Sequence, residues 1–194
     1  MSDKYHHGDL RNALIEESIK MINTSGEDSL SMRKLAEKCG VSMAAPYAHF
    51  KNKEEMINAI KKYVEDAFVE YLEKAVAGAG GADGDIEIKI IALGNAYVSF
   101  FIDNPEYFTF LFSRGYVHLN LDYNSDEDNF KPYKLLKDLC KRYFSEKMPD
   151  LSDHDKELEI IRIWSSVQGL TSIIFMKNVK WSRNWKDEIV NILK

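Results

Sequence analysis

The sequence has little of the residue types that build a disulfide framework, a metal centre or a membrane segment. Its 194 residues include two cysteines, Cys39 and Cys140, and neither belongs to a Cys-x-x-Cys pair. Cysteines so far apart predict neither a disulfide framework nor a zinc site, and they fit a reducing, cytoplasmic compartment. No apolar run approaches the roughly 18 uninterrupted residues of a spanning helix, and the first residues lack an apolar signal core. We therefore expect neither secretion nor membrane insertion.

Sequence motifs of the common enzyme classes are also missing. The chain contains no Gly-x-Ser-x-Gly and no His-Glu-x-x-His, and His6 and His7 are adjacent rather than four apart on a helix face. The one glycine-rich segment, residues 78–84, is followed by no Lys-Ser or Lys-Thr, so we interpret it as a flexible joint between helices. We expect no catalytic activity, no cofactor and no metal.

Strand patterns are scarce, whereas helical patterns fill the chain. Residues 86–90 alternate like a strand, but apolar residues then return at helical spacing and no second alternating run exists to pair with them. Asn52 with Glu55 forms a predicted N-terminal capping pair for a long helix. An apolar content of 45% is enough for a full core. We predict an all-α protein.

Residues 40–56 are the most informative segment, because they predict a tight turn, a short helix and a group of phosphate-binding side chains. Upstream, residues 31–39 predict a second short helix, so that two short helices flank the turn. Gly40 can take the positive φ that redirects the chain, and Ser31 and Ser42 are the predicted N-caps of the two helices. Five residues have the spacing of one small shared core: Leu35, Ala36, Val41, Tyr47 and Phe50. This is helix-turn-helix patterning, in which the second helix enters the major groove of DNA.

Basic charge is concentrated on the same segment. The whole chain carries a net charge of −5. Between Ser29 and Lys53 there are five cations against one anion, a net charge of +4 that leaves −9 for the remaining residues. Cations attract phosphate groups, and the acidic remainder repels them, so we expect DNA to dock on this face alone.

The segment resembles the N-terminal domain of TetR-type transcriptional regulators. Gly40-Val-Ser42, then Tyr47-x-His49-Phe50, then Lys53 recur in this order in that family, and residues 5–15 resemble its first helix. The resemblance implies an N-terminal three-helix helix-turn-helix head at about residues 1–50. A larger helical bundle at residues 51–194 would bind a ligand and dimerise. The implied partners are double-stranded DNA with a palindromic operator and a second copy of the chain.

The DNA contacts can be assigned by residue type. Hydroxyl, imidazole and cationic donors suit phosphate oxygens; the candidates are Ser31, Arg33, Ser42, Tyr47, His49, Lys51 and Lys53. The resemblance assigns Tyr47, His49 and Lys53 to this grip, whereas helix capping is an alternative role for both serines and a half-buried core ring for Tyr47. The start of the recognition helix, Met43, Ala44 and Ala45, offers no bidentate hydrogen bond to a base. Specificity should therefore come from thymine methyl contacts and DNA shape.

The C-terminal part predicts a dimer and a candidate ligand site. The segment from Trp164 to Leu170 is similar to the Trp-His-Gly signature of one TetR subgroup, with Gln168 where His is usual. The helix holding Trp164 is apolar on more than one face, so it must be covered on several sides. The resemblance implies that a second subunit covers one of these sides. The resemblance implies a cavity for a small hydrophobic or aromatic effector, lined by Tyr97, Phe101, Phe108, Phe112, Trp164 and Gln168. An aromatic core without a cavity is the alternative.

Two functions fit these patterns. The first is a repressor that a small-molecule effector releases from its operator. The second is a DNA-bound adaptor that signals through a protein partner and has no small-molecule pocket. Unpaired polar groups in the bundle favour the first function, because a ligand can pair with them, whereas a closed and fully satisfied bundle favours the second.

Overall fold

The computed structural model describes residues 7–81, 84–125, 127 and 129–193, and all regular secondary structure in these ranges is helical. The all-α prediction is confirmed. The chain forms two compact units, Met1–Val64 with Glu106–Tyr116 and Glu65–Pro105 with Val117–Lys194. The first unit extends beyond the predicted head of residues 1–50. None of the described helices combines the length and apolar character needed to cross a bilayer.

The first unit is built around α1 (His7–Ser25), which packs on η1 (Glu27–Ser29), α2 (Met32–Lys38) and α3 (Ala45–His49). The beginning of α4 (Lys53–Gly78) and nearly all of α6 (Pro105–Phe112) complete it. The core is mainly aliphatic, and three residues predicted to share it are buried: Leu35, Ala36 and Phe50. These side chains hold the two short helices together.

Side-chain caps set the starts of α2 and α4 in this unit. The Ser31 hydroxyl accepts a hydrogen bond from the Lys34 N–H at 3.2 Å, which confirms the predicted N-cap of α2. Gly40 has φ of 66°, as the predicted turn requires. The Asn52 side chain accepts from the Glu55 N–H at 2.8 Å, so the start of α4 is also capped as predicted.

The N-cap predicted at Ser42 is wrong. Helix α3 begins at Ala45, its N-cap position is Ala44, and no side chain caps it. The Ser42 carbonyl instead accepts from the Ala45 N–H at 3.0 Å, within a turn that precedes the helix. Pro46 lies in the first turn of α3, where its missing N–H costs no hydrogen bond, so the helix begins later than the serine suggests.

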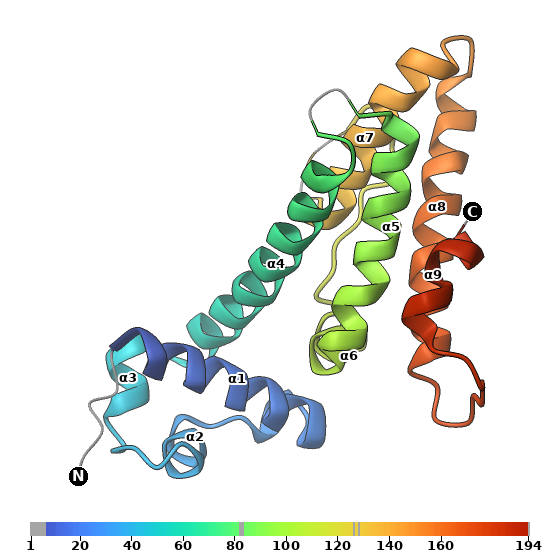
Figure 1. Cartoon of the computed structure of the whole chain (residues 1–194). Helices are drawn as coiled ribbons and strands as arrows, with labels where there is room; N and C mark the ends of the chain where they lie inside the picture. The colour runs from blue at the N-terminus through green and yellow to red at the C-terminus, as the bar shows by residue number, and fades with distance from the viewer. Residues whose placement is uncertain (1–6, 82–83, 126, 128, 194) are drawn as a thin grey trace. The chain divides into compact units, whose positions relative to one another are not determined.

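The second unit is organised around α5 (Ile86–Asp103). This helix packs on α7 (Lys131–Lys147), α8 (Asp153–Ile174) and α9 (Trp185–Leu193) (Figure 1). The alternating residues 86–90 are helical as predicted, and Asp85 caps them by accepting from the Glu87 N–H at 2.9 Å. Gly94 lets α9 approach α5, because a Cβ there would lie 3.3 Å from the Leu193 Cδ1.

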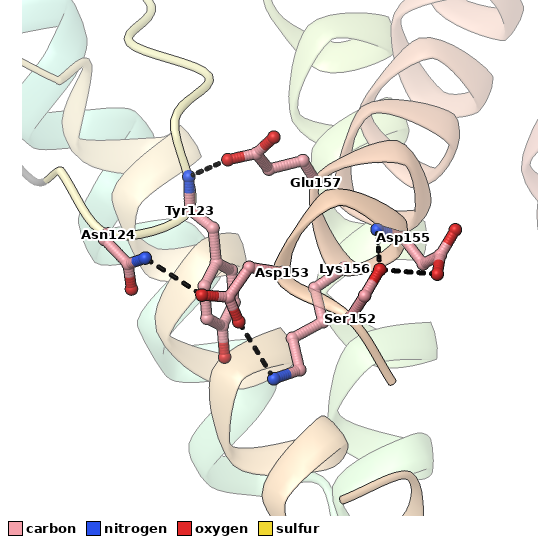
Figure 2. A network of polar contacts seen from close by, with 7 residues as sticks. All are labelled: Tyr123, Asn124, Ser152, Asp153, Asp155, Lys156 and Glu157. Carbon is pink, nitrogen blue, oxygen red and sulfur yellow. Dashed lines mark hydrogen bonds and ion pairs between the residues drawn. The ribbon is translucent and has the colours of Figure 1, made fainter. Parts of the chain in front are cut away.

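Polar contacts fasten the segment between α6 and α7 to the start of α8, as Figure 2 shows. The Glu157 carboxylate accepts from the Tyr123 N–H at 2.8 Å, and Asp153 accepts from the Asn124 side chain at 3.0 Å. Lys137 of α7 is fully buried and donates to two backbone carbonyls of the same segment. These oxygens replace water around the buried ammonium group, so the segment is tied to both helices.

Candidate nucleic-acid interface

Two large side chains at the turn and at α3, the predicted recognition helix, are largely exposed. Met43, just before α3, is 50% exposed, and Tyr47 within α3 is 58% exposed. Pro46 and Phe50 take the positions that face the core. The interpretation of Tyr47 as a half-buried core ring is therefore wrong. Exposed apolar groups that gather on one short element mark an interaction surface.

The other predicted DNA-contacting residues lie along the same stretch of chain. All ten are at least partly exposed: Ser31, Arg33, Ser42, Met43, Ala44, Ala45, Tyr47, His49, Lys51 and Lys53. They follow one another from the start of α2, through the turn and α3, to the start of α4. The Ser31 hydroxyl also caps α2 by accepting from the Lys34 N–H, whereas the other candidate phosphate-binding groups are placed by their exposure where phosphate oxygens could reach them.

Arg11 of α1 is a cation of this unit that the assignment by residue type missed. Its guanidinium carbon lies 5.2 Å from the centre of the Phe50 ring, a cation–π contact that holds the charge near the end of α3. The side chain is exposed. Arg11 lies within residues 5–15, and the resemblance of this segment to the first helix of TetR-type regulators is the sequence signal that could have identified it.

Four of the six predicted ligand-site residues gather in the second unit. The Tyr97 ring lies 5.3 Å from the rings of Phe101 and Trp164, and its hydroxyl donates a hydrogen bond to the Gln168 side-chain oxygen. Burial raises the pKa of Tyr97 well above its usual value, so its hydroxyl remains a donor. A neighbouring helix thus supplies a partner for Gln168.

The remaining two residues, Phe108 and Phe112, lie on α6 in the first unit. Their ring centroids are 5.0 Å apart. The six residues therefore do not form one cluster within a single unit. The sequence places all of them at helical spacing, which does not reveal that α6 joins the N-terminal unit.

Tyr133 of α7 was not predicted as a site residue, yet it carries the kind of unpaired group that a ligand can meet. It is fully buried, and its ring centroid lies 5.2 Å from that of Trp164. Its hydroxyl has no hydrogen-bond partner within the described residues. Burial raises the pKa of Tyr133 to about 12, so the group is a neutral donor. Its helical spacing with Leu136 and Cys140 is the sequence pattern that could have predicted its burial.

We expect Gln168→Leu to lower the free energy of unfolding by about 1–3 kcal/mol, because it leaves the buried Tyr97 hydroxyl unpaired. Urea unfolding followed by circular dichroism measures the change. The double variant Tyr97→Phe with Gln168→Leu is the matched control. It removes both polar partners and should recover most of the loss. Equal losses in the single and double variants would show that the hydrogen bond is not the cause.

A second polar cluster, also missed, ties α6 to the N-terminal helices of the first unit. The Glu16 carboxylate of α1 accepts hydrogen bonds from Tyr63 of α4, at 3.0 Å, and from Tyr107 of α6. Burial together with these contacts to Glu16 raises the pKa of both tyrosines. One carboxylate therefore joins three helices that are distant in sequence.

Two further contacts strengthen the attachment of α6. The Arg114 guanidinium, just after α6, donates to the Ile22 carbonyl at 2.7 Å. The Asn23 side chain donates to the Glu106 carbonyl at 2.8 Å. Both acceptors are backbone carbonyls, so the attachment of α6 depends on directional hydrogen bonds as well as on apolar packing.

Comparisons with known proteins agree with this geometry in the N-terminal part. Residues 14–60 match the family described as bacterial regulatory proteins, tetR family. Tetracycline repressor protein class C of Escherichia coli is 40% identical over 50 residues, which are 26% of this chain and 23% of that protein. The class A repressor from transposon 1721, also of Escherichia coli, is 41% identical over 49 residues, 25% of this chain and 23% of that protein. The match thus spans less than a quarter of these relatives.

Solved structures are similar along nearly the whole chain. A TetR-family regulator from Haemophilus influenzae has a TM-score of 0.68 at 18% identity, covering 96% of this chain and 95% of its own. PfmR, a TetR-family regulator from Thermus thermophilus, has a TM-score of 0.62 at 21% identity, covering 92% and 97%. At such identities the similarity shows the fold. The chain therefore carries the N-terminal domain of the tetR family at residues 14–60, within the fold of solved TetR-family structures.

Proposed function

We propose that this protein is a DNA-binding transcriptional regulator, without catalytic activity, that binds a palindromic operator as a homodimer. One observation carries the proposal: Tyr47 and Met43 are uncovered beside a turn that matches a DNA-binding family, within the basic segment of an acidic chain. Two recognition helices, one from each subunit, then read half-sites about one turn of DNA apart.

The mode of operator recognition follows from the side chains at the start of α3. Met43, Ala44 and Ala45 carry no hydrogen-bonding group, and Ala44 is exposed. Small apolar side chains contact thymine methyl groups and allow close approach of the helix to the groove floor. We propose that they and DNA shape set specificity, while Tyr47, His49 and the neighbouring cations hold the backbone.

The effector class follows from the second unit. Tyr97, Phe101 and Trp164 form an aromatic cluster, and the buried Tyr133 hydroxyl beside it lacks a partner within the described residues. These groups suit a small hydrophobic or aromatic molecule with one hydrogen-bond acceptor. One similar fold, AibR, was solved in complex with isovaleryl coenzyme A and operator DNA; it is 18% identical, with a TM-score of 0.62, and the match covers 93% of this chain and 94% of that one. Gln168, where the Trp-His-Gly subgroup has His, leaves this cluster without a titrating imidazole.

The proposed mode is repression that the effector relieves. An effector that binds one arrangement of the helices better than another shifts the protein toward that arrangement. Helix α4 runs through both compact units, from Lys53 next to the recognition helix to Gly78. The chain therefore has a continuous helix through which effector binding can lower operator affinity.

The adaptor function remains the second candidate because of one contact. Tyr97 and Gln168 satisfy each other, so this pair needs no ligand. A DNA-bound adaptor without a small-molecule pocket predicts that no hydrophobic effector changes DNA binding. The unpaired Tyr133 hydroxyl favours the effector-responsive repressor.

Selection of bound sequences from a random DNA pool tests the proposal. The wild-type protein should select a palindrome, with an affinity that falls steeply as salt concentration rises. Ala44→Arg should change the preferred half-site, because arginine adds a bidentate contact to guanine. Lys74→Arg, on the exposed far part of α4, is the matched control and should select the wild-type site. Binding without salt dependence, or no selected sequence, would refute the proposal.

A further inference from the structure

An apolar groove lies open between α5 and α8. It has a volume of about 530 Å³. Its walls are mainly aliphatic, contributed by Ile90 and Ile91 of α5, Ile163 and Val167 of α8, and Leu193 of α9. Helix α9 closes its lower end where Leu193 meets Gly94, whereas the turns of α5 and α8 before that point are uncovered. Ile91 is 37% exposed there.

The rim of this groove is acidic. Glu87 and Glu159 line it, and only one cation, Arg162, lies on the same rim, already paired with Glu159. Glu87 accepts a hydrogen bond from Tyr143, which leaves its charge in place. A favourable occupant therefore combines apolar side chains with positive charge.

Residues 176–181, between α8 and α9, have this combination. Met176 is 58% exposed, Val179 39% and Trp181 40%. Lys177 and Lys180 alternate with them and are exposed, with no ion pair in the part of the chain that the structure describes. The segment is thus uncovered, apolar and basic, while the groove is uncovered, apolar and acidic at the rim.

The exposed side of α8 indicates how a second copy of the chain can bring its residues 176–181 to the groove between α5 and α8. Large apolar side chains lie near its ends, with Leu158 at 45% exposure and Ile173 at 44%, and exposed Ser165 and Gly169 lie between them. The midpoint between Leu158 and Ile173 lies at residues 165–166, next to the small side chain of Ser165. An antiparallel pair of α8 helices therefore places Leu158 near the end of the partner's helix, with close contact at the small residues in the middle.

We propose that in the homodimer, whose existence rests on the proposed function, α8 packs antiparallel on its copy and residues 176–181 of each chain fill the other chain's groove between α5 and α8. In a twofold arrangement of this kind, the end of the partner's α8 lies beside the open end of the groove. The partner's Trp181 and the partner's Val179 cover Ile91, and the partner's Lys180 faces the acidic rim. Each groove is incomplete without the other subunit.

Disulfide trapping in the full-length chain tests this register. The variant Ile91→Cys with Val179→Cys is made with Cys39→Ser, while Cys140 is kept because it is buried and burial raises its pKa to about 12. Mild oxidation should convert most of the protein to a covalent dimer on a non-reducing gel. Glu73→Cys with Val179→Cys in the same background is the control, since Glu73 is exposed on α4, and it should stay uncrosslinked.

A second measurement does not depend on the introduced cysteines. Trp181→Ser should raise the dimer dissociation constant at least about tenfold in sedimentation experiments, because aromatic anchors dominate interfaces. Met148→Ser, an equally exposed residue at the end of α7, should leave it unchanged, with helicity checked by circular dichroism. A stable dimer that neither crosslinks nor responds to Trp181→Ser overturns this register and leaves the proposed function standing. A monomer at all concentrations overturns both.

Discussion

Tyr47→Ala is expected to lower operator affinity by about tenfold to a hundredfold, the loss that follows from about 0.7–1.4 kcal/mol lost at each of two half-sites. The Tyr47 ring is 58% exposed. Because it supports no core contact, the free energy of unfolding should change by less than about 0.5 kcal/mol. Fluorescence anisotropy with labelled operator DNA, together with urea unfolding, measures both quantities.

The matched control for this prediction is Tyr71→Ala. Tyr71 is an exposed tyrosine of α4 in the second unit, at 40% exposure, and it lies against Phe100 with a centroid distance of 5.5 Å. Its loss should cost some stability and leave DNA affinity unchanged. If Tyr47→Ala instead destabilised the fold and bound DNA normally, the side chain would be structural and the candidate interface would lose its central residue.

The helix-turn-helix was predictable because its signals are local. Ser31 caps α2 from three residues away, and Gly40 supplies the left-handed turn at the position where the chain must reverse. The core residues Leu35 and Phe50 follow from helical spacing. The prediction of an N-cap at Ser42 was wrong for a reason that is also local. Pro46 favours a position in the first turn of a helix, so α3 begins at Ala45 rather than directly after Ser42.

The position of α6 was not predictable from periodicity. Its apolar residues have the same helical spacing as those of the bundle, so Phe108 and Phe112 were grouped with Tyr97 and Trp164. What places α6 in the first unit is a set of single side-chain contacts over long sequence separations. The Glu16 carboxylate meets Tyr63 across 47 positions and Tyr107 across 91. Periodicity within one sequence gives no signal for pairs so far apart.

The unpaired hydroxyl of Tyr133, in the candidate ligand site, was also not predictable from periodicity. Spacing along α7 predicts that this residue is buried, but only the packed structure shows that its ring meets Trp164 and that no described group pairs with its hydroxyl. In the sequence, Gln168 was singled out because it stands where the resembling subgroup has His. In the structure Gln168 is satisfied by Tyr97, and the unsatisfied group lies on the neighbouring helix.

Glu16→Ala is expected to lower the free energy of unfolding by about 2–4 kcal/mol, because it leaves two partly buried tyrosine hydroxyls without their charged acceptor. The neighbouring variant Glu17→Ala is the control. Glu17 lies on the same helix and pairs at 3.4 Å with Lys38, whose side chain is 56% exposed, so its loss should cost about 0–1 kcal/mol. Urea unfolding at neutral pH measures both variants.

A triple variant separates the hydrogen bonds from the helix itself. Glu16→Ala combined with Tyr63→Phe and Tyr107→Phe removes the carboxylate and both donors, so no unpaired group remains and much of the lost stability should return. If the triple variant is as unstable as Glu16→Ala, the aliphatic part of Glu16 rather than its carboxylate holds α6. If it recovers, the contact between α6 and the N-terminal helices depends on a few directional bonds.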